Sequence, residues 1–321
     1  MKHLPQDLEN DTAKPGEPVT LLQPRKRFSE CEGYKPDRGL VDAIKVALLL
    51  RKPLLLTGRP GTGKTELGHY LGWKMHLPVY QFDSKSNSVA RDLFYVYDAI
   101  RHFRAGGDIQ PFLTFNALGL AILNCARQTP ELVRDLPDCV AKKPTQSVVV
   151  IDEVDKTPRD FPNDLLNEID NNYFRIPELR NLKVEAEPEL APVVIVTSNS
   201  EKNLPGAFLR RCVYYNVPFP KETELRAIVS RRVAEFSNSE GMLLKDMVDR
   251  FSAVAAEESG LKHPPGTSEL LDWALALVRR DANTDANLSM QKQLLKETVG
   301  ALVKSEDDLA PAKKLLGIDE K

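Results

Sequence analysis

The sequence predicts an α/β protein in which a three-layer core surrounds a parallel five-stranded sheet, followed by a small all-α domain. Three observations support this fold class. Five short apolar runs occur between residues 53 and 217, and each is continuous rather than alternating, which is typical of strands buried on both faces. Helix-like segments separate most of these runs, as a parallel sheet requires. After residue 220 the strand signal ends and only helical patterns follow.

The elements follow in order along the chain. A helix is expected at residues 39–50, where apolar residues recur on one face. The five strands are expected at residues 53–57, 79–82, 148–151, 193–197 and 213–217. Helices between them are expected at residues 63–75, 114–127 and 161–171. The later helical patterns lie at residues 221–236, 241–257, 267–280 and 286–303.

These elements divide the chain into a core and three further parts. Residues 1–27 are polar and rich in Pro, Lys and Asp, which is typical of a tail or a loosely docked arm. Residues 28–220 hold the α/β core, residues 221–303 the helical domain, and the charged residues 304–321 are interpreted as a C-terminal tail. The chain between the second and third strands is longer than a minimal connection, which indicates an insertion within about residues 92–145.

Composition and charge disfavour several classes of protein. The net charge is −2, from 44 basic and 46 acidic residues, so no overall basic field indicates a nucleic-acid partner. The four cysteines lie far apart and form no pair or Cys/His cluster at zinc spacing. The N-terminus lacks the apolar segment of a signal peptide, and charged residues interrupt the most apolar stretch, residues 39–57. We therefore expect a cytoplasmic protein without a membrane span.

The first motif is a Gly-rich loop between the first strand and the helix after it. Residues 58–65, GRPGTGKT, fit the pattern G-x-x-x-x-G-K-[ST]. Such a loop turns its backbone N–H groups toward phosphate oxygens, and the helix N-terminus adds its positive dipole. Lys64 is expected to reach the β- and γ-phosphates, and Thr65 to offer its hydroxyl to Mg²⁺. The candidate nucleotide-binding residues here are Gly58, Arg59, Pro60, Gly61, Thr62, Gly63, Lys64, Thr65 and Glu66.

Two further strands end in polar residues that complete the motif set. Residues 148–153, VVVIDE, form an apolar strand that delivers Asp152 to the metal side of the pocket, so Thr65 and Asp152 are the candidate metal ligands. Glu153 is the candidate general base, and the Asp-Glu pair favours water as the phosphoryl acceptor. The strand that ends in VTSN places the Asn199 amide as a candidate sensor of the water and the γ-phosphate.

Taken in order, GRPGTGKT, VVVIDEVDK, VTSN and LPGAFLRRC resemble the motifs of the AAA+ ATPase superfamily. The segment at residues 151–172, together with the insertion within residues 92–145, resembles the MoxR-like branch of that superfamily. The resemblance covers roughly residues 28–280. It implies a P-loop AAA+ core with a helical lid, ATP/ADP and Mg²⁺ as ligands, and a ring of subunits, usually a hexamer, with ATP between neighbours.

The resemblance also assigns roles to residues outside the phosphate loop. The arginine that reaches into the adjacent subunit's site corresponds to Arg211, while Arg210 occupies a position that is often acidic in relatives and is the second candidate. A guanidinium suits this role because it stays charged and presents a planar fork of donors to the transferred phosphoryl group. Tyr34 and Leu40 are expected to line the adenine pocket.

Two features depart from the family pattern or leave alternatives open. The third helix of the lid normally begins with a sensor arginine, whereas Thr267 and Ser268 stand there in this chain, so the role has passed to another cation, with Lys262 as a candidate, or is absent. In the insertion, Phe103, Arg104 and Phe112 either contact a client or pack within the inserted element. Two short strands are expected within residues 174–196, before the sensor strand.

The leading functional hypothesis is a MoxR-like AAA+ ATPase whose ring uses ATP hydrolysis to remodel or chaperone a protein partner. Relatives often act with a von Willebrand factor A domain protein, and the resemblance implies such a partner. The alternative is a nucleic-acid-directed AAA+ motor or regulator of the replication, restriction or defence type. A GTPase is disfavoured because the guanine-reading Asn-Lys-x-Asp is missing, and a non-hydrolysing scaffold because the catalytic set is complete.

Overall fold

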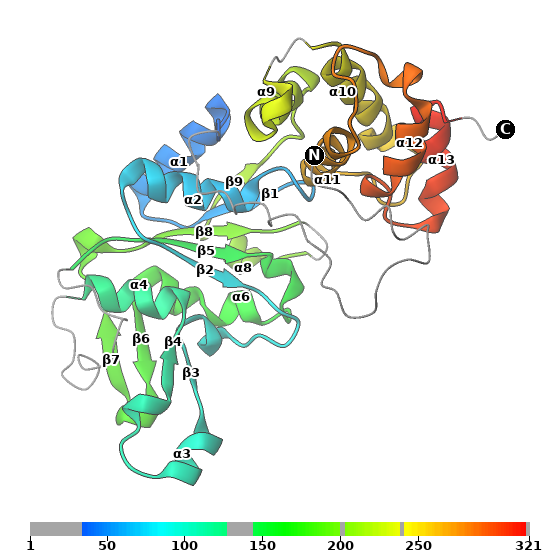
Figure 1. The fold of residues 1–321 in the computed structure, drawn as a ribbon. Coiled ribbons are helices and arrows are strands. Elements are labelled where there is room, and N and C mark those ends of the chain that lie inside the picture. The colour runs from blue at the N-terminus through cyan, green and yellow to red at the C-terminus, as the bar shows by residue number, and fades with distance from the viewer. Residues whose placement is uncertain (1–33, 127–143, 200–202, 238–240, 319–321) are drawn as a thin grey trace.

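A computed structural model describes residues 34–126, 144–199, 203–237 and 241–318 of the chain. Its centre is a parallel five-stranded sheet in the order β2-β5-β8-β1-β9 (Figure 1). The strands are β1 (Leu54–Thr57), β2 (Val79–Asp83), β5 (Val148–Asp152), β8 (Val193–Thr197) and β9 (Val213–Asn216). Each boundary lies within one residue of the prediction, so the predicted α/β fold with its parallel sheet is confirmed. The predicted arm at residues 1–27 lies outside the described residues.

Both faces of the sheet are buried, which explains the continuous apolar runs. Leu54 and Leu56 pack in one hydrophobic cluster with α1 (Arg38–Leu50) and α2 (Lys64–Met75). Leu55, between them, packs in a second cluster with α4 (Ala117–Cys125). Figure 1 shows α1 and α2 on one side of the sheet, and α4 and α6 (Phe161–Asp164) on the other. The core therefore has three layers.

Gly119 on α4 provides a stability prediction. A Cβ atom at this position would lie 1.9 Å from the backbone oxygen of Phe94, which cannot rotate away. Gly119→Ala is therefore expected to lower the free energy of unfolding by about 1–3 kcal/mol through overpacking. The matched control is Gly300→Ala, because no atom lies within 4 Å of the corresponding Cβ. Urea denaturation measures both, and equal midpoints for the two variants would contradict the close contact.

Two antiparallel hairpins extend from the same side of the core (Figure 1). The insertion forms β3 (Tyr95–Tyr97), α3 (Ala99–Ala105) and β4 (Leu113–Phe115), with β3 paired to β4. The second hairpin joins β6 (Tyr173–Ile176) to β7 (Leu182–Glu185), which confirms the two short strands expected before β8. The ring of Phe174 lies 5.4 Å from that of Phe94 and 6.3 Å from that of Tyr95, so the hairpins pack on each other. Two short helices, α7 (Leu166–Asn171) and α8 (Gly206–Leu209), complete the core.

The helices after the core share a separate hydrophobic cluster. They are α9 (Glu222–Arg232), α10 (Met242–Ala255), α11 (Thr267–Arg279), α12 (Lys292–Thr298) and α13 (Glu306–Leu316). Trp273 is fully buried in this cluster, and its Nε1 donates to Thr298 Oγ1 at 3.0 Å. The cluster gives these helices a core of their own. Within the described residues, no helix combines the length and apolarity needed to cross a membrane.

The prediction of a charged tail at residues 304–321 is wrong for residues 306–316. Helix α13 buries Ala312 and Leu316 against the cluster formed by α9–α12. Asp308 is also buried, because its carboxylate accepts from the backbone N–H groups of Lys262 and His263 at 2.7 and 3.1 Å. Many charges in this segment therefore lie on the outer face of an amphipathic helix, and one of them, Asp308, satisfies the backbone of a neighbouring loop.

Candidate nucleotide-binding site

A cavity of about 540 Å³ opens at the carboxyl edge of the sheet, between the core and the helical region. Residues that follow β1, β5, β8 and β9 line one side of it, and residues of α9 and α11 line the other. This is where ligands bind in open α/β sheets. The predicted site residues that line the cavity are Tyr34, Leu40, Pro60, Gly61, Thr62, Gly63, Lys64, Thr65, Glu66, Asp152, Glu153 and Asn199.

The Gly-rich loop depends on backbone conformations that glycine adopts without strain. Gly58, Gly61 and Gly63 have φ values of 136°, 75° and 85°. At Gly58 a Cβ atom would lie 2.6 Å from the backbone oxygen of Val217, so the first turn also packs tightly against the residue that follows β9. The structure does not bring Arg59 into the cavity: its guanidinium carbon lies 4.6 Å from the centre of the Phe219 ring.

Lys64 begins α2 and is buried beside the cavity. Its Nζ donates to the backbone oxygens of Gly58 and Arg59 at 2.8 and 2.9 Å, which holds the ammonium against the loop. Burial lowers the pKa of Lys64, while the nearby carboxylates, Asp152 foremost, act in the opposite direction. A desolvated cation in this position suits the binding of an anion such as a phosphate group.

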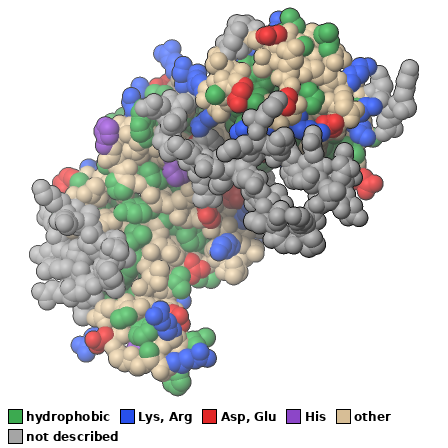
Figure 2. Space-filling view, in the orientation of Figure 1, with side chains coloured by type: hydrophobic (Ala, Val, Ile, Leu, Met, Phe, Trp, Pro, Cys, Tyr) green, Lys and Arg blue, Asp and Glu red, His purple; other side chains and the backbone are tan. Residues whose placement is uncertain are grey.

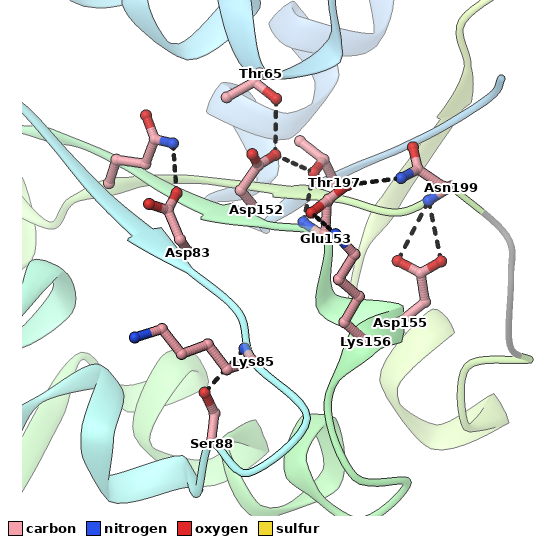
Figure 3. Close-up of polar contacts among 11 residues, drawn as sticks. Thr65, Asp83, Lys85, Ser88, Asp152, Glu153, Asp155, Lys156, Thr197 and Asn199 are labelled. Carbon is pink, nitrogen blue, oxygen red and sulfur yellow. Dashed lines mark hydrogen bonds and ion pairs between the residues drawn. The ribbon is translucent and has the colours of Figure 1, made fainter. Parts of the chain in front are cut away.

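Three hydroxyl and carboxylate groups meet at the ends of β5 and β8 (Figure 3). Thr65 Oγ1 and Thr197 Oγ1 both donate to Asp152 Oδ1, at 2.7 and 2.5 Å. Thr197 Oγ1 also accepts from the backbone N–H of Glu153 at 2.9 Å. The sequence interpretation missed Thr197, whose only signal was a polar residue at the end of an apolar strand. The Thr65 hydroxyl and the Asp152 carboxylate fit Mg²⁺, which binds few protein oxygens and completes its shell with water and phosphate.

Glu153 and Asn199 lie together beside this group (Figure 3). Asn199 Nδ2 donates to Glu153 Oε1 at 2.9 Å, and the backbone N–H of Asn199 donates to Asp155 Oδ2 at 3.2 Å. The other oxygen of Glu153 pairs with the Lys156 ammonium. Glu153 has a left-handed φ of 53°, which takes the chain out of the strand direction where β5 ends. The carboxylate is thus held from two sides at the wall of the cavity.

The segment before α1 and the first turn of that helix form another wall of the cavity. Tyr34 and Leu40 line it, and the Tyr34 ring packs on Tyr70 with the ring centres 5.3 Å apart. Asp37 Oδ1 accepts from the Leu40 N–H at 3.0 Å and from the Tyr215 hydroxyl at 2.7 Å, which fixes the segment to β9. Burial and then Asp37 raise the pKa of Tyr215 to about 12, so this hydroxyl stays protonated and donating. An apolar wall with an aromatic ring suits a nucleotide base.

Arg210 and Arg211 are exposed and do not line the cavity of their own chain. They follow α8 directly, and Arg211 Nε lies 2.7 Å from Asp170 Oδ2 on α7. The ion pair aims the Arg211 side chain along the surface of the core rather than into the pocket.

The helical region contributes two arginines that the sequence interpretation missed. Arg231 and Arg232, at the end of α9, line the cavity together with Thr267 and Ser268 at the start of α11. The candidate Lys262 does not line it, because its Nζ pairs with Asp307 Oδ2 at 2.5 Å on the surface. Helical spacing places Glu224, Ala227, Ile228 and Arg231 on one face of α9, but nothing in the sequence shows that this face meets the cavity.

A glycine loop that leads from β1 into α2, with a lysine and a threonine, and an aspartate at the end of a nearby strand define a P-loop nucleoside triphosphate site. The sequence model of the AAA family, the ATPase family associated with various cellular activities, matches residues 54–219. That is just over half of the chain, and the chain belongs to this family of ATPases.

The remaining comparisons add similarity of fold. No curated protein matches the chain. A mutant of RuvB from Thermotoga maritima is 14% identical with a TM-score of 0.47, and the match covers 93% of this chain and 75% of that one. The RuvB Holliday junction branch migration motor of the same organism is 15% identical with a TM-score of 0.44, over 88% of this chain and 68% of that one. Similarity at this level supports no conclusion about function.

Proposed function

We propose that this chain is an ATP-hydrolysing AAA+ protein of the MoxR-like branch, which forms a ring, most simply a hexamer, and remodels or chaperones a protein partner. The observation that carries the ATPase proposal is the cluster of Thr65, Asp152, Glu153 and Asn199 at one wall of the P-loop cavity. In this proposal residues 28–220 are the nucleotide-binding core. The lid comprises residues 221–303 together with α13.

Each residue of the cluster has a distinct role in the proposed hydrolysis. The loop N–H groups and Lys64 bind the phosphate chain, and Thr65 and Asp152 hold Mg²⁺, which when bound neutralises phosphate charge. Glu153 accepts a proton from the attacking water as that oxygen bonds to the γ-phosphorus and the bond to the bridging oxygen breaks, which yields ADP and phosphate. Asn199, already bonded to Glu153, orients that carboxylate and reaches the γ-phosphate.

The assignment to the MoxR-like branch is supported by the two hairpins. The tip of the insertion exposes Phe103 at 91% and Ile100 at 69%, and Figure 2 shows hydrophobic and basic side chains gathered over α3. Phe112, by contrast, is buried and its ring stacks on His102 at 4.8 Å, so it packs within the element. We propose the tip, with Phe103 and Arg104, as the surface that contacts a client or a von Willebrand factor A domain partner in the cytoplasm.

The alternative of a nucleic-acid-directed motor has one local feature in its favour. Arg101 and Arg104 flank the exposed Phe103 on α3, and basic and aromatic side chains together bind single strands. Fluorescence anisotropy with labelled DNA distinguishes the two readings. Binding that weakens about tenfold or more between low and moderate salt, and that Arg101→Ala reduces, would favour the motor.

The test of the proposed function is assembly coupled to hydrolysis. The wild-type chain is expected to hydrolyse ATP, and Glu153→Gln with ATP is expected to elute as a ring in size-exclusion chromatography with light scattering. Lys64→Ala is the control, because it removes the buried ammonium and should lose both ATP binding and assembly. A Glu153→Gln chain that stays monomeric and hydrolyses ATP at the wild-type rate would refute the proposal.

A further inference from the structure

Helix α9 turns a face toward the cavity whose side chains change from acidic through apolar to basic along the helix. Glu224, Ala227, Ile228 and Arg231 line the cavity, and their spacing of three and four residues places them on one side of the helix. Arg232 joins them in the last turn. The face therefore runs from a carboxylate through an apolar middle to two guanidinium groups.

The cationic end of this face lines the same cavity as the phosphate-binding loop. Glu66 follows Thr65 on α2 and also lines the cavity. Burial raises the pKa of Glu66, while the electrostatic influence of His69 and then of Arg232 acts in the opposite direction, so the Arg232 guanidinium lies within electrostatic range of this carboxylate. Glu66 follows the lysine and threonine of the loop, so Arg232 shares the cavity with the loop residues that are proposed to bind phosphate.

The start of α11 contacts the same loop directly. A Cβ atom on Gly266 would lie 2.6 Å from the Pro60 backbone oxygen, and one on Gly61 would lie 3.0 Å from the Thr267 backbone nitrogen. Thr267 is 7% exposed and lines the cavity, yet among the described residues its Oγ1 has no hydrogen-bond partner. A buried hydroxyl without a partner is costly, and a ligand oxygen in the cavity would supply one.

We propose that Arg232 and Arg231 of α9, with the Thr267 hydroxyl, form the lid half of the site and bind the phosphate chain of ATP. This inference rests on the proposed function and adds to it. It accounts for the absence of an arginine at the start of α11, where Thr267 and Ser268 stand, because α9 supplies the cations to the cavity instead. Arginine suits the role because its planar fork of donors matches phosphate oxygens. The apolar middle of the face, Ala227 and Ile228, faces the uncharged part of the ligand.

The test is the affinity of the purified full-length chain for a fluorescent ATP analogue. Arg232→Ala, alone and with Arg231→Ala, is expected to weaken ATP binding by about 10- to 100-fold, as the loss of hydrogen bonds to a charged group predicts. Adenosine, measured as a competitor, is expected to bind within about twofold of its wild-type affinity, because it has no phosphate. Arg232→Lys is expected to retain an intermediate ATP affinity, since it keeps the charge and loses the fork. Thr267→Val should weaken ATP binding by a smaller factor, about threefold.

The matched control is Arg226→Ala, on the same helix but outside the cavity lining, which should leave ATP binding unchanged. This inference alone would be overturned if the Arg231/Arg232 double variant binds ATP within twofold of the wild type while Lys64→Ala binds ATP poorly. An equal loss for adenosine and ATP, or an equal loss in Arg226→Ala, would overturn it too. Wild-type affinity in Lys64→Ala would instead refute the proposed P-loop function, and this inference with it.

Discussion

Arg211→Ala is expected to lower ATP hydrolysis by about 10³- to 10⁵-fold while leaving ATP binding near that of the wild type. The reason for the first effect is chemical, because a guanidinium stabilises the charge that spreads over the transferred phosphoryl group. The reason for the second is geometric. Arg211 is exposed, pairs with Asp170, and lies outside the cavity lining of its own chain. We therefore propose that it acts on a neighbour's nucleotide.

The fold should survive this substitution. The Arg211 and Asp170 side chains are 44% and 39% exposed, and an exposed pair of this kind contributes little to stability. Arg210→Ala is the matched control, since Arg210 is the adjacent exposed arginine. If Arg210→Ala abolishes hydrolysis and Arg211→Ala does not, the finger is Arg210.

Mixing two inactive variants shows whether the arginine acts across subunits. Arg211→Ala subunits keep an intact P-loop site but offer no finger, whereas Glu153→Gln subunits bind ATP, assemble and offer the finger but lack the base. A mixture is expected to regain part of the wild-type hydrolysis, because some Arg211→Ala sites then face a Glu153→Gln neighbour. No recovery at any mixing ratio, with mixed rings present, would show that Arg211 acts within its own chain.

The sheet could be predicted from sequence because both of its faces are buried. Leu54, Leu55 and Leu56 belong alternately to two core clusters, so every position of the strand had to be apolar. The sequence did not predict the burial of α13 for the opposite reason. Only a few of its positions, such as Ala312 and Leu316, are apolar and buried, so the segment has the charged composition of a tail. Its Asp308 is buried because it accepts a hydrogen bond from a backbone N–H of a neighbouring loop.

The candidate site was predictable where chemistry is fixed by local motifs and not where it depends on packing between distant segments. Lys64, Asp152 and Glu153 follow strands whose ends meet at one edge, so their proximity follows from the topology. Thr197 joins Asp152 to the Glu153 backbone through a side chain that no motif identifies. Arg232 reaches the cavity only because the helices beyond the core pack over the phosphate loop, which sequence spacing does not reveal.

Glu153→Gln is the second substitution with a large expected effect, a fall in hydrolysis of about 10²- to 10⁴-fold with ATP still bound. Glutamine has nearly the same shape, so its amide oxygen can keep the bond from Asn199 Nδ2 that Glu153 Oε1 accepts at 2.9 Å. It cannot accept a proton from water, so only the chemical step is lost. Measured turnover and binding of a fluorescent ATP analogue separate the two effects.

The control for this variant must separate the loss of the base from the loss of its ion pair. Lys156 pairs with the second carboxylate oxygen of Glu153, and its side chain is 44% exposed. Lys156→Met removes the ion pair and leaves the base, so hydrolysis is expected to stay within about threefold of the wild type, as an exposed pair contributes little. An equal loss in Lys156→Met and Glu153→Gln would mean that the ion pair, not proton transfer to Glu153, governs the rate. Hydrolysis by Glu153→Gln within about tenfold of the wild type would assign the proton to another acceptor.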